Sequence, residues 1–536
     1  MAAFLLFFFL TAAYLLFVTV SYFRRKVRKV SGPPRPSFLL GHEWIIRQQD
    51  NVSDLKMSWY HQYGTAYRIG GCFGQDVLVV SDPKALQYIF HMSGYRFPKV
   101  KDSVRAADAF FGPGLATVGG SVHQRQRKIL NGSFSASQLR KIFLLFQSSA
   151  SLPTDKLNDQ IKSGPRVLNA VEWTSKVALD IIGMTSFRYR FEALNGGQTE
   201  LRDALDNLIT DSQMHPRVID LLFMALWRML PDSILNILSW IPSKDTRRLM
   251  DFKDVTKKIA RNIFKNQLAV VSNGKNAEEK DMVNVLALSY LSDEDKKKMS
   301  NDEIESQLAT FILAGHDTTA NAIAWLLYEL ARHPDDQIRI RDEIRQVQLS
   351  EEVLTSNDYD SMPFLNAAIK ETLRRHPFVH TLYRMADQDD VLPLSEPVTT
   401  TDGRVATEIP ISKGQVISAS LYTYNHLPTV WGNDADRWNP GRFLDSAERR
   451  QLSLGVYSNL YAHFSSSKLL DADGSDRMTV MEIQTVIVEL LSKFEFKVPV
   501  GVELLDAPGT QSCVPIVKGQ LEDGVQVPLQ VAPLET

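Results

Sequence analysis

Polar residues interrupt a long stretch of this sequence that is otherwise strongly helical. Apolar side chains recur at three- and four-residue steps from Ile304 to Arg332, which predicts one helix with a buried face. Gly315, Asp317, Thr318 and Thr319 lie in its middle. Glycine there costs about 1 kcal/mol relative to alanine, and a threonine hydroxyl can bond a carbonyl one turn back and bend the helix. A weakened centre indicates a functional site. A core helix with a tolerated polar patch is the alternative.

Two further pairs of residues are spaced so that they share a helix face. His123 and Arg127 are four apart, and a guanidinium can clamp a carboxylate in bidentate fashion. A basic, solvated helix face is the alternative for this pair. Glu371 and Arg374 are three apart in the predicted helix 363–377, which proline bounds at both ends. If exposed, such a pair contributes only about 0.2–0.5 kcal/mol.

Composition limits the class of protein. The chain has 536 residues, is 44% hydrophobic and carries a formal charge of -2, so it can bury a large core and shows no basic excess suited to nucleic acid. Its two cysteines, Cys72 and Cys513, exclude a disulfide framework and suit a reducing compartment.

The first residues predict a membrane anchor. Residues 4–23 carry no charge and are long enough to span a bilayer as a helix. Arginine and lysine residues follow directly, which places the C-terminal side of the span in the cytosol. A cleaved signal peptide is the weaker alternative, because no basic region precedes the apolar run. A proline-rich stretch then predicts a stiff hinge.

Several separated motifs resemble those of the cytochrome P450 monooxygenases of the microsomal, fungal type. Residues 314–319 (Ala-Gly-His-Asp-Thr-Thr) resemble the family's oxygen-activation motif, and Glu371-x-x-Arg374 resembles its buried Glu-x-x-Arg pair. Residues 439–443 resemble its Pro-x-Arg-Phe motif. The three motifs occur in the family's order, and the resemblance extends from the hinge to near the C-terminus, apart from one loop.

The resemblance implies a mainly α-helical fold with a small β-sheet region, in one domain over residues 41–536, after an anchor at 1–23 and a hinge at 24–40. It also implies residue roles. The expected proton relay to iron-bound dioxygen consists of Asp317 and Thr318. The expected haem-side scaffold consists of Glu371, Arg374, Arg442 and Phe443. The expected partners of the haem propionates are His123, Arg127 and Arg384.

The family also implies partners and a place in the cell. The cofactor would be haem b, and the electrons would come from NADPH through a membrane-bound reductase, or through cytochrome b5. The substrate would be an apolar small molecule such as a terpenoid, steroid, fatty or aromatic compound. The expected location is the endoplasmic reticulum membrane, with a single span and the catalytic domain in the cytosol.

One loop departs from the family pattern. The family ligates haem iron through the thiolate of a Phe-x-x-Gly-x-Arg-x-Cys-x-Gly loop, but residues 462–476 contain no cysteine. The ligand position falls at Asp471 when counted from Phe464 and at Asp473 when counted back from Arg477. The replacement suits a splicing or frameshift artefact, or a relic. The alternative function is therefore a non-catalytic, membrane-anchored protein of the same fold. Other conceivable iron ligands, all weaker, are His463, Cys513 and Cys72.

Overall fold

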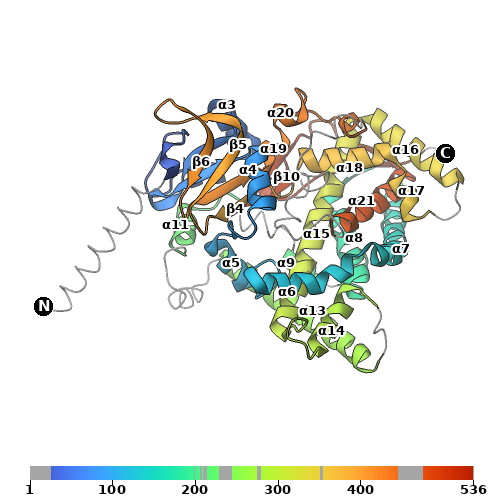
Figure 1. The fold of residues 1–536 in the computed structure, drawn as a ribbon. Coiled ribbons are helices and arrows are strands. Elements are labelled where there is room, and N and C mark those ends of the chain that lie inside the picture. The colour runs from blue at the N-terminus through green and yellow to red at the C-terminus, as the bar shows by residue number, and fades with distance from the viewer. Residues whose placement is uncertain are drawn as a thin grey trace.

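Helices form most of the molecule (Figure 1). The computed structural model describes residues 26–197, 199–205, 208, 214–227, 244–274, 279–350, 354–444 and 475–534. The α-helices in these ranges are α2 (Glu43–Arg47), α3 (Ser53–Tyr63), α4 (Pro83–Gln87), α5 (Lys101–Phe111), α6 (Gly120–Leu130), α7 (Ala136–Ile161), α8 (Ala170–Phe187), α9 (Thr199–Leu205), α11 (Val218–Trp227), α13 (Lys244–Ser272), α14 (Met282–Leu291), α15 (Asn301–Arg332), α16 (Pro334–Ser350), α17 (Ser356–Asp360), α18 (Pro363–Arg375), α19 (Leu421–Asn425), α20 (Pro428–Trp431) and α21 (Ser475–Leu491).

The strands form small sheets, the largest of which has four strands. Its order is β1 (Ala66–Gly70), β2 (Asp76–Val80), β7 (Val416–Ser420) and β4 (Thr381–Met385), with only the β2–β7 pair parallel. A second sheet has the strand order β3 (Arg166–Asn169), β11 (Pro528–Pro533) and β8 (Phe494–Lys497). Two smaller sheets pair β5 (Asp390–Thr399) with β6 (Val405–Ile411), and β9 (Leu504–Pro508) with β10 (Cys513–Val517). The predicted mainly helical fold with a small sheet region is confirmed.

Helix α15 crosses the middle of the molecule, where α8, α13 and α21 pack around it (Figure 1). It begins at a capping box, in which Ser300 Oγ accepts from the Glu303 amide and the Glu303 carboxylate accepts from the Ser300 amide. The predicted helix over Ile304–Arg332 is therefore confirmed, three residues longer at its start. Its second half is buried almost without interruption, which fixes its position relative to α8 and α21.

The proline-rich segment before the domain packs onto the sheet. Val27 and Val30 are buried, and Val30 forms a β-bridge with Thr400. The backbone of Gly32 lies so close to Arg68 that an added Cβ would meet the Arg68 carbonyl oxygen. The described part of the hinge, residues 26–40, is thus held against the domain.

Within the described residues, no helix is both long and apolar enough to cross a bilayer. The predicted anchor at 1–23 lies outside the described residues, as do residues 445–474, which include His463, Asp471 and Asp473.

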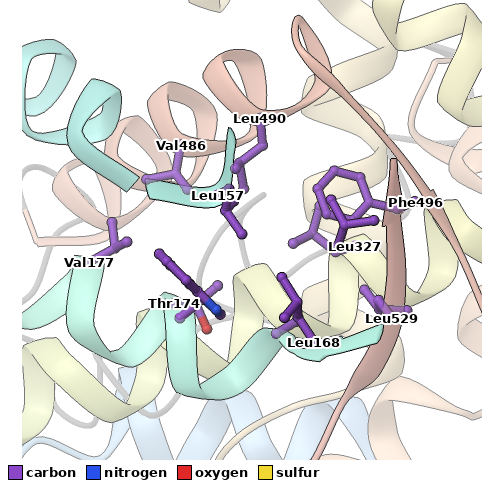
Figure 2. A pocket seen from close by; sticks show the side chains of 12 residues that line it. Leu157, Leu168, Thr174, Val177, Leu327, Val486, Leu490, Phe496 and Leu529 are labelled. Atoms are coloured by element: carbon purple, nitrogen blue, oxygen red, sulfur yellow. The ribbon is translucent and has the colours of Figure 1, made fainter. Parts of the chain in front are cut away.

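An apolar cavity of about 30 Å3 lies in the core between α7, α8, α15, α21 and the β8–β11 sheet (Figure 2). Leucine and valine side chains such as Leu157, Val486 and Leu490 line it. The Thr174 hydroxyl donates to the Ala320 carbonyl at 2.9 Å, so its proton is already used. We interpret this cavity as a packing gap, because its lining offers almost no polar group to a ligand.

Candidate functional site

The polar centre of α15 faces a small cavity. Thr318 Oγ1 donates to the Ala314 carbonyl one turn back at 2.7 Å, and Asn321 Nδ2 donates to the Asp317 carbonyl at 2.7 Å. The cavity lies between α15, α18, the start of α21 and the start of β10. Its lining residues are Thr318, Asn321, Ala322, Trp325, Leu373, His376, Phe378, Thr479 and Cys513. The expected proton-relay hydroxyl therefore reaches a cavity.

Asp317 lies beside a residue that the sequence analysis gave no role. Its carboxylate oxygen Oδ1 is 2.7 Å from Nδ1 of His316, which is buried. The imidazole and the carboxylate are thus in contact, although Nδ1 of His316 has no hydrogen-bond partner among the described residues. Because the motif places these two residues side by side in the sequence, their contact could have been anticipated.

A buried cluster of basic side chains brings together the three residues expected to hold carboxylates. His123, Arg127 and Arg384 are all at least 93% buried, and the backbone of Lys99 forms a β-bridge with that of Arg384. Burial, followed by the charges of Lys99 and Arg127, lowers the pKa of His123 to about 4. Burial and the charge of Arg384 lower the pKa of Lys99 to about 8.

The charges that lower the pKa values of His123 and Lys99 therefore come from other members of the cluster. Burial alone lowers the pKa of Arg384 to about 10. Buried cations repel one another and are costly unless an anion joins them. The cluster fits a ligand with more than one carboxylate. Lys99 was missed in the sequence analysis because it lies 24 residues before His123, in the segment that precedes α5.

The predicted scaffold residues meet at one carboxylate. Arg374 binds both oxygens of Glu371 at 2.8 Å, and Arg442 Nε donates to Glu371 Oε1 at 3.1 Å. Arg374 also donates to the carbonyls of Asn425 and Ala435 at 2.6 and 2.7 Å. This ties the segment after α20 to α18, and Phe443 packs against Trp431 nearby. The sequence alone allowed an exposed pair, but Glu371 and Arg374 are fully buried.

This buried Glu–Arg–Arg constellation sits beside a long helix with a polar centre, and the comparisons with known proteins agree with it. The model of the family described as Cytochrome P450 matches residues 31–458. The chain belongs to the cytochrome P450 family. It is 30% identical to cytochrome P450 monooxygenase 81 of Postia placenta, over 90% of this chain and 88% of that protein. It is 27% identical to cytochrome P450 monooxygenase claU of Ampulloclitocybe clavipes, over 98% and 96% of the two chains.

Members of this family are haem-dependent monooxygenases, and part of the described site suits haem. The basic cluster of Lys99, His123, Arg127 and Arg384 fits the two propionates of a haem. Thr318 and Thr479 line one cavity from α15 and α21, the two helices that would enclose the macrocycle. Among the described residues, the propionate side therefore fits haem.

The axial position does not supply the thiolate that the family uses. The family match ends at residue 458, four residues before the loop 462–476, which contains no cysteine. Cys72 lies in the β1–β2 turn, and Cys513 donates its thiol proton to the Pro377 carbonyl at 2.9 Å. Burial raises the pKa of Cys513 well above its usual range, which keeps this thiol protonated.

One further acid near the cavity was not anticipated. Glu482 on α21 is buried, and its carboxyl group is hydrogen-bonded to Thr319 on α15. Burial raises its pKa well above the ordinary value, although the bond from Thr319 acts in the opposite direction. A glutamate inside an apolar helix was visible in the sequence, but its contact with Thr319 depends on the packing of α21 against α15.

Proposed function

We propose that this protein is a monooxygenase that inserts one oxygen atom of dioxygen into an apolar small molecule, with electrons from NADPH supplied by a reductase. The buried basic cluster, together with a cavity at Thr318 in a chain of this family, is the observation that supports the proposal. Haem, when bound with a thiolate ligand, supplies the activation of dioxygen.

The residues of the chain would bind, orient and move protons. His123, Arg127, Arg384 and Lys99 would neutralise the two propionates and so fix the plane of the cofactor. Glu371, Arg374 and Arg442 would hold the segment that leads into the axial loop. Their role is one of positioning, since their polar atoms are bound to one another and to backbone carbonyls.

Thr318 and Asp317 would deliver the protons. The Thr318 hydroxyl donates its own proton to Ala314, so its oxygen lone pairs remain available to accept a hydrogen bond in the cavity. Asp317, whose carboxylate contacts His316, lies next to Thr318 in the sequence and is only partly buried, so it is within reach of solvent. The expected direction of transfer is from solvent through Asp317 to Thr318 and into the cavity.

Replacing Thr318 tests this assignment. In a chain whose 462–476 loop carries the family's cysteine, with an apolar compound that this chain turns over, Thr318→Ala should lower product per NADPH by about tenfold or more. The balance of the electrons should appear as hydrogen peroxide. Thr310→Ala is the matched control, because its hydroxyl also donates to a carbonyl one turn back at 2.7 Å. Coupling that stayed at the wild-type value in Thr318→Ala would contradict the relay.

We also propose that the domain is held at the endoplasmic reticulum membrane by residues 1–23 and faces the cytosol. Exposed apolar side chains on the described surface support this location, since Phe38, Leu39, Ile219 and Met224 are 46–66% exposed. The Phe38 and Leu39 backbones bond to the turn that contains Cys72, and α11 contacts both that turn and α2.

A tag at the C-terminus should be digested by protease added outside sealed microsomes, and a protected tag would contradict this topology.

A further inference from the structure

A histidine to which the sequence analysis gave no role lies between two buried carboxylates. His376 directly follows α18, and its Nε2 is 2.9 Å from Glu329 Oε1 on α15. Its Nδ1 is 3.0 Å from Asp506 Oδ2 and 3.2 Å from Asp506 Oδ1 on β9. The three residues are at most 9% exposed. We call this arrangement the His376 bridge, because it joins α15, α18 and β9, which are far apart in the sequence.

The geometry of the His376 bridge requires a protonated ring. A neutral imidazole carries one N–H, whereas both ring nitrogens here face a carboxylate at hydrogen-bond distance. The ring stacks on Trp325 with the two planes 4° apart, which holds its orientation. Only an imidazolium can donate to Glu329 and Asp506 together. Loss of its proton to solvent would leave one buried carboxylate facing a ring lone pair, which is costly.

The other charged groups around the bridge do not replace the imidazolium. Arg332 Nη1 and His333 Nδ1 lie 3.4 and 3.6 Å from Glu329 Oε2, which is not the oxygen that faces His376. Among the described residues, Asp506 forms no other ion pair. Burial acts to lower the pKa of His376, but the two carboxylates outweigh it and raise that pKa. Further titratable groups around the bridge are Lys56, Arg374, Arg375, Tyr422, His426 and Cys513.

The bridge lies in the wall of the cavity at Thr318. His376, Trp325 and Cys513 all line this cavity. Cys513 begins β10, and β10 pairs along its whole length with β9, which carries Asp506. Helices α15 and α18 and strand β10 lie side by side (Figure 1). The position of the Cys513 wall relative to Thr318 therefore depends on how β9 is held.

The β9–β10 hairpin is attached differently at its two strands. At the start of β10, the Cys513 amide donates to the Phe378 carbonyl at 2.7 Å. On β9, the Leu504 amide donates to Tyr328 Oη on α15 at a long 3.4 Å. The short carboxylate contacts of the His376 bridge are therefore the strong link between β9 and the pair of helices α15 and α18.

We propose that the His376 bridge positions the β9–β10 wall of the cavity at Thr318, and that loss of the imidazolium proton releases this wall from α15. This inference rests on the proposed function, because the cavity is where the substrate would be oxidised. It makes His376 a positioning residue for that reaction. The wall is held while the ring is protonated, and it is released as the pH rises.

Hydrogen exchange of the full chain, followed by mass spectrometry from about pH 6 to about pH 9, tests the bridge without requiring haem. After correction for the intrinsic exchange rate, protection of the β9 amides should fall by about tenfold across this range, while β1 and β2 keep theirs. Asp506→Asn should abolish this pH dependence, because a neutral amide can pair with a neutral ring. His61→Gln is the control, because His61 is exposed on α3.

The reactivity of Cys513 tests whether the release reaches the cavity. In a Cys72→Ser chain at pH 7, His376→Gln should make dithiodipyridine modify Cys513 about tenfold faster, because this thiol is 3% exposed behind the wall. His61→Gln should leave the rate unchanged. A circular dichroism spectrum like that of wild type shows that each variant is folded, and Asp506→Ala is the second variant if His376→Gln does not fold.

Protection of β9 that stays constant with pH in the wild type would overturn the proposal. Protection that falls equally in β1 and β2 would also overturn it, since the bridge would then contribute only to global stability. A Cys513 rate that is unchanged when the bridge is broken would contradict the positioning role. Failure of the proposed function would appear separately, as absent product in a haem-loaded chain whose β9 still shows the transition.

Discussion

The Glu371 carboxylate accepts hydrogen bonds from three residues on two separate segments of the chain. Arg374 binds it within α18, and Arg442 and the Asn439 amide bind it from the segment that leads toward the axial loop. Buried charges of this kind stabilise the fold only while every partner is present, because each would otherwise be desolvated without compensation.

Removing Arg442 should therefore be costly. We expect Arg442→Leu to lower the free energy of unfolding by about 3 kcal/mol, because it leaves Glu371 and Asp434 short of a partner. Thermal unfolding followed by circular dichroism measures the change. Lys297→Ala removes an exposed ion pair with Glu294 and should shift stability by less than about 0.5 kcal/mol. An equally small effect for Arg442→Leu would show that the constellation contributes nothing to the fold.

His376 gives the stability of the molecule a dependence on pH. Its ring stacks on Trp325 with centroids 3.7 Å apart, and its two nitrogens face Glu329 at 2.9 Å and Asp506 at 3.0 Å. Burial acts to lower the pKa of His376, but Asp506 and Glu329 outweigh it and raise the pKa above the ordinary value. Arg332, His333 and Arg375 also act on this group through Glu329.

A histidine with a raised folded pKa stabilises most at a pH below its unfolded pKa of about 6.5, and this contribution is lost as the pH rises through the folded pKa. The stability difference between wild type and His376→Gln should therefore shrink as the pH increases from about 6 to about 9. Melting temperatures of both proteins across this range test the sign. A difference that grew with pH would mean that the imidazole is neutral in the folded protein.

Some residues of the site were predictable from the sequence because local spacing places them together. Glu371 with Arg374, and His123 with Arg127, lie one helical turn apart, so the helix alone brings each pair onto one face. Lys99 and Glu482 were not predictable, because their partners come from other elements. Burial distinguishes a structural Glu371–Arg374 pair from an exposed surface pair, and a three-residue spacing carries no information on burial.

At the scale of elements, the sequence predicted the position of α15 more completely than it predicted the pairing of the strands. Its apolar periodicity predicted the helix almost to its ends. Strands β1 and β2 can also be recognised from the sequence, because glycines mark the turn between them, where Gly74 has a φ of 71°. The parallel pairing of β2 with β7, more than 300 residues later, could not be read from local patterns.

The start of α15 depends on its capping box. Ser300→Ala should destabilise the protein by about 1 kcal/mol, because it removes the acceptor for the Glu303 amide. Hydrogen exchange of the first turn of α15, followed by mass spectrometry, should show faster exchange there. Ser148→Ala is the control, since that hydroxyl lies inside α7 and donates to the Leu145 carbonyl. Unchanged exchange at the start of α15 would mean that packing, and not the cap, holds the turn.

At the scale of the whole molecule, every described part of the haem-side architecture is assembled while the axial loop departs from the family. The basic cluster, the scaffold around Glu371 and the cavity between α15 and α21 are all present. The family match stops at residue 458, and residues 462–476 contain no cysteine. A fold that keeps the binding elements of its cofactor should regain the family's iron ligation when the ligand alone is restored.

The carbon monoxide difference spectrum of the reduced protein in membranes tests this account most directly. We predict no thiolate-type Soret band from the chain as written, and a thiolate-type band from at least one of the variants Asp471→Cys and Asp473→Cys. The two variants cover the two registers of the loop. A thiolate-type band from the chain as written, or none from either variant, would contradict the account.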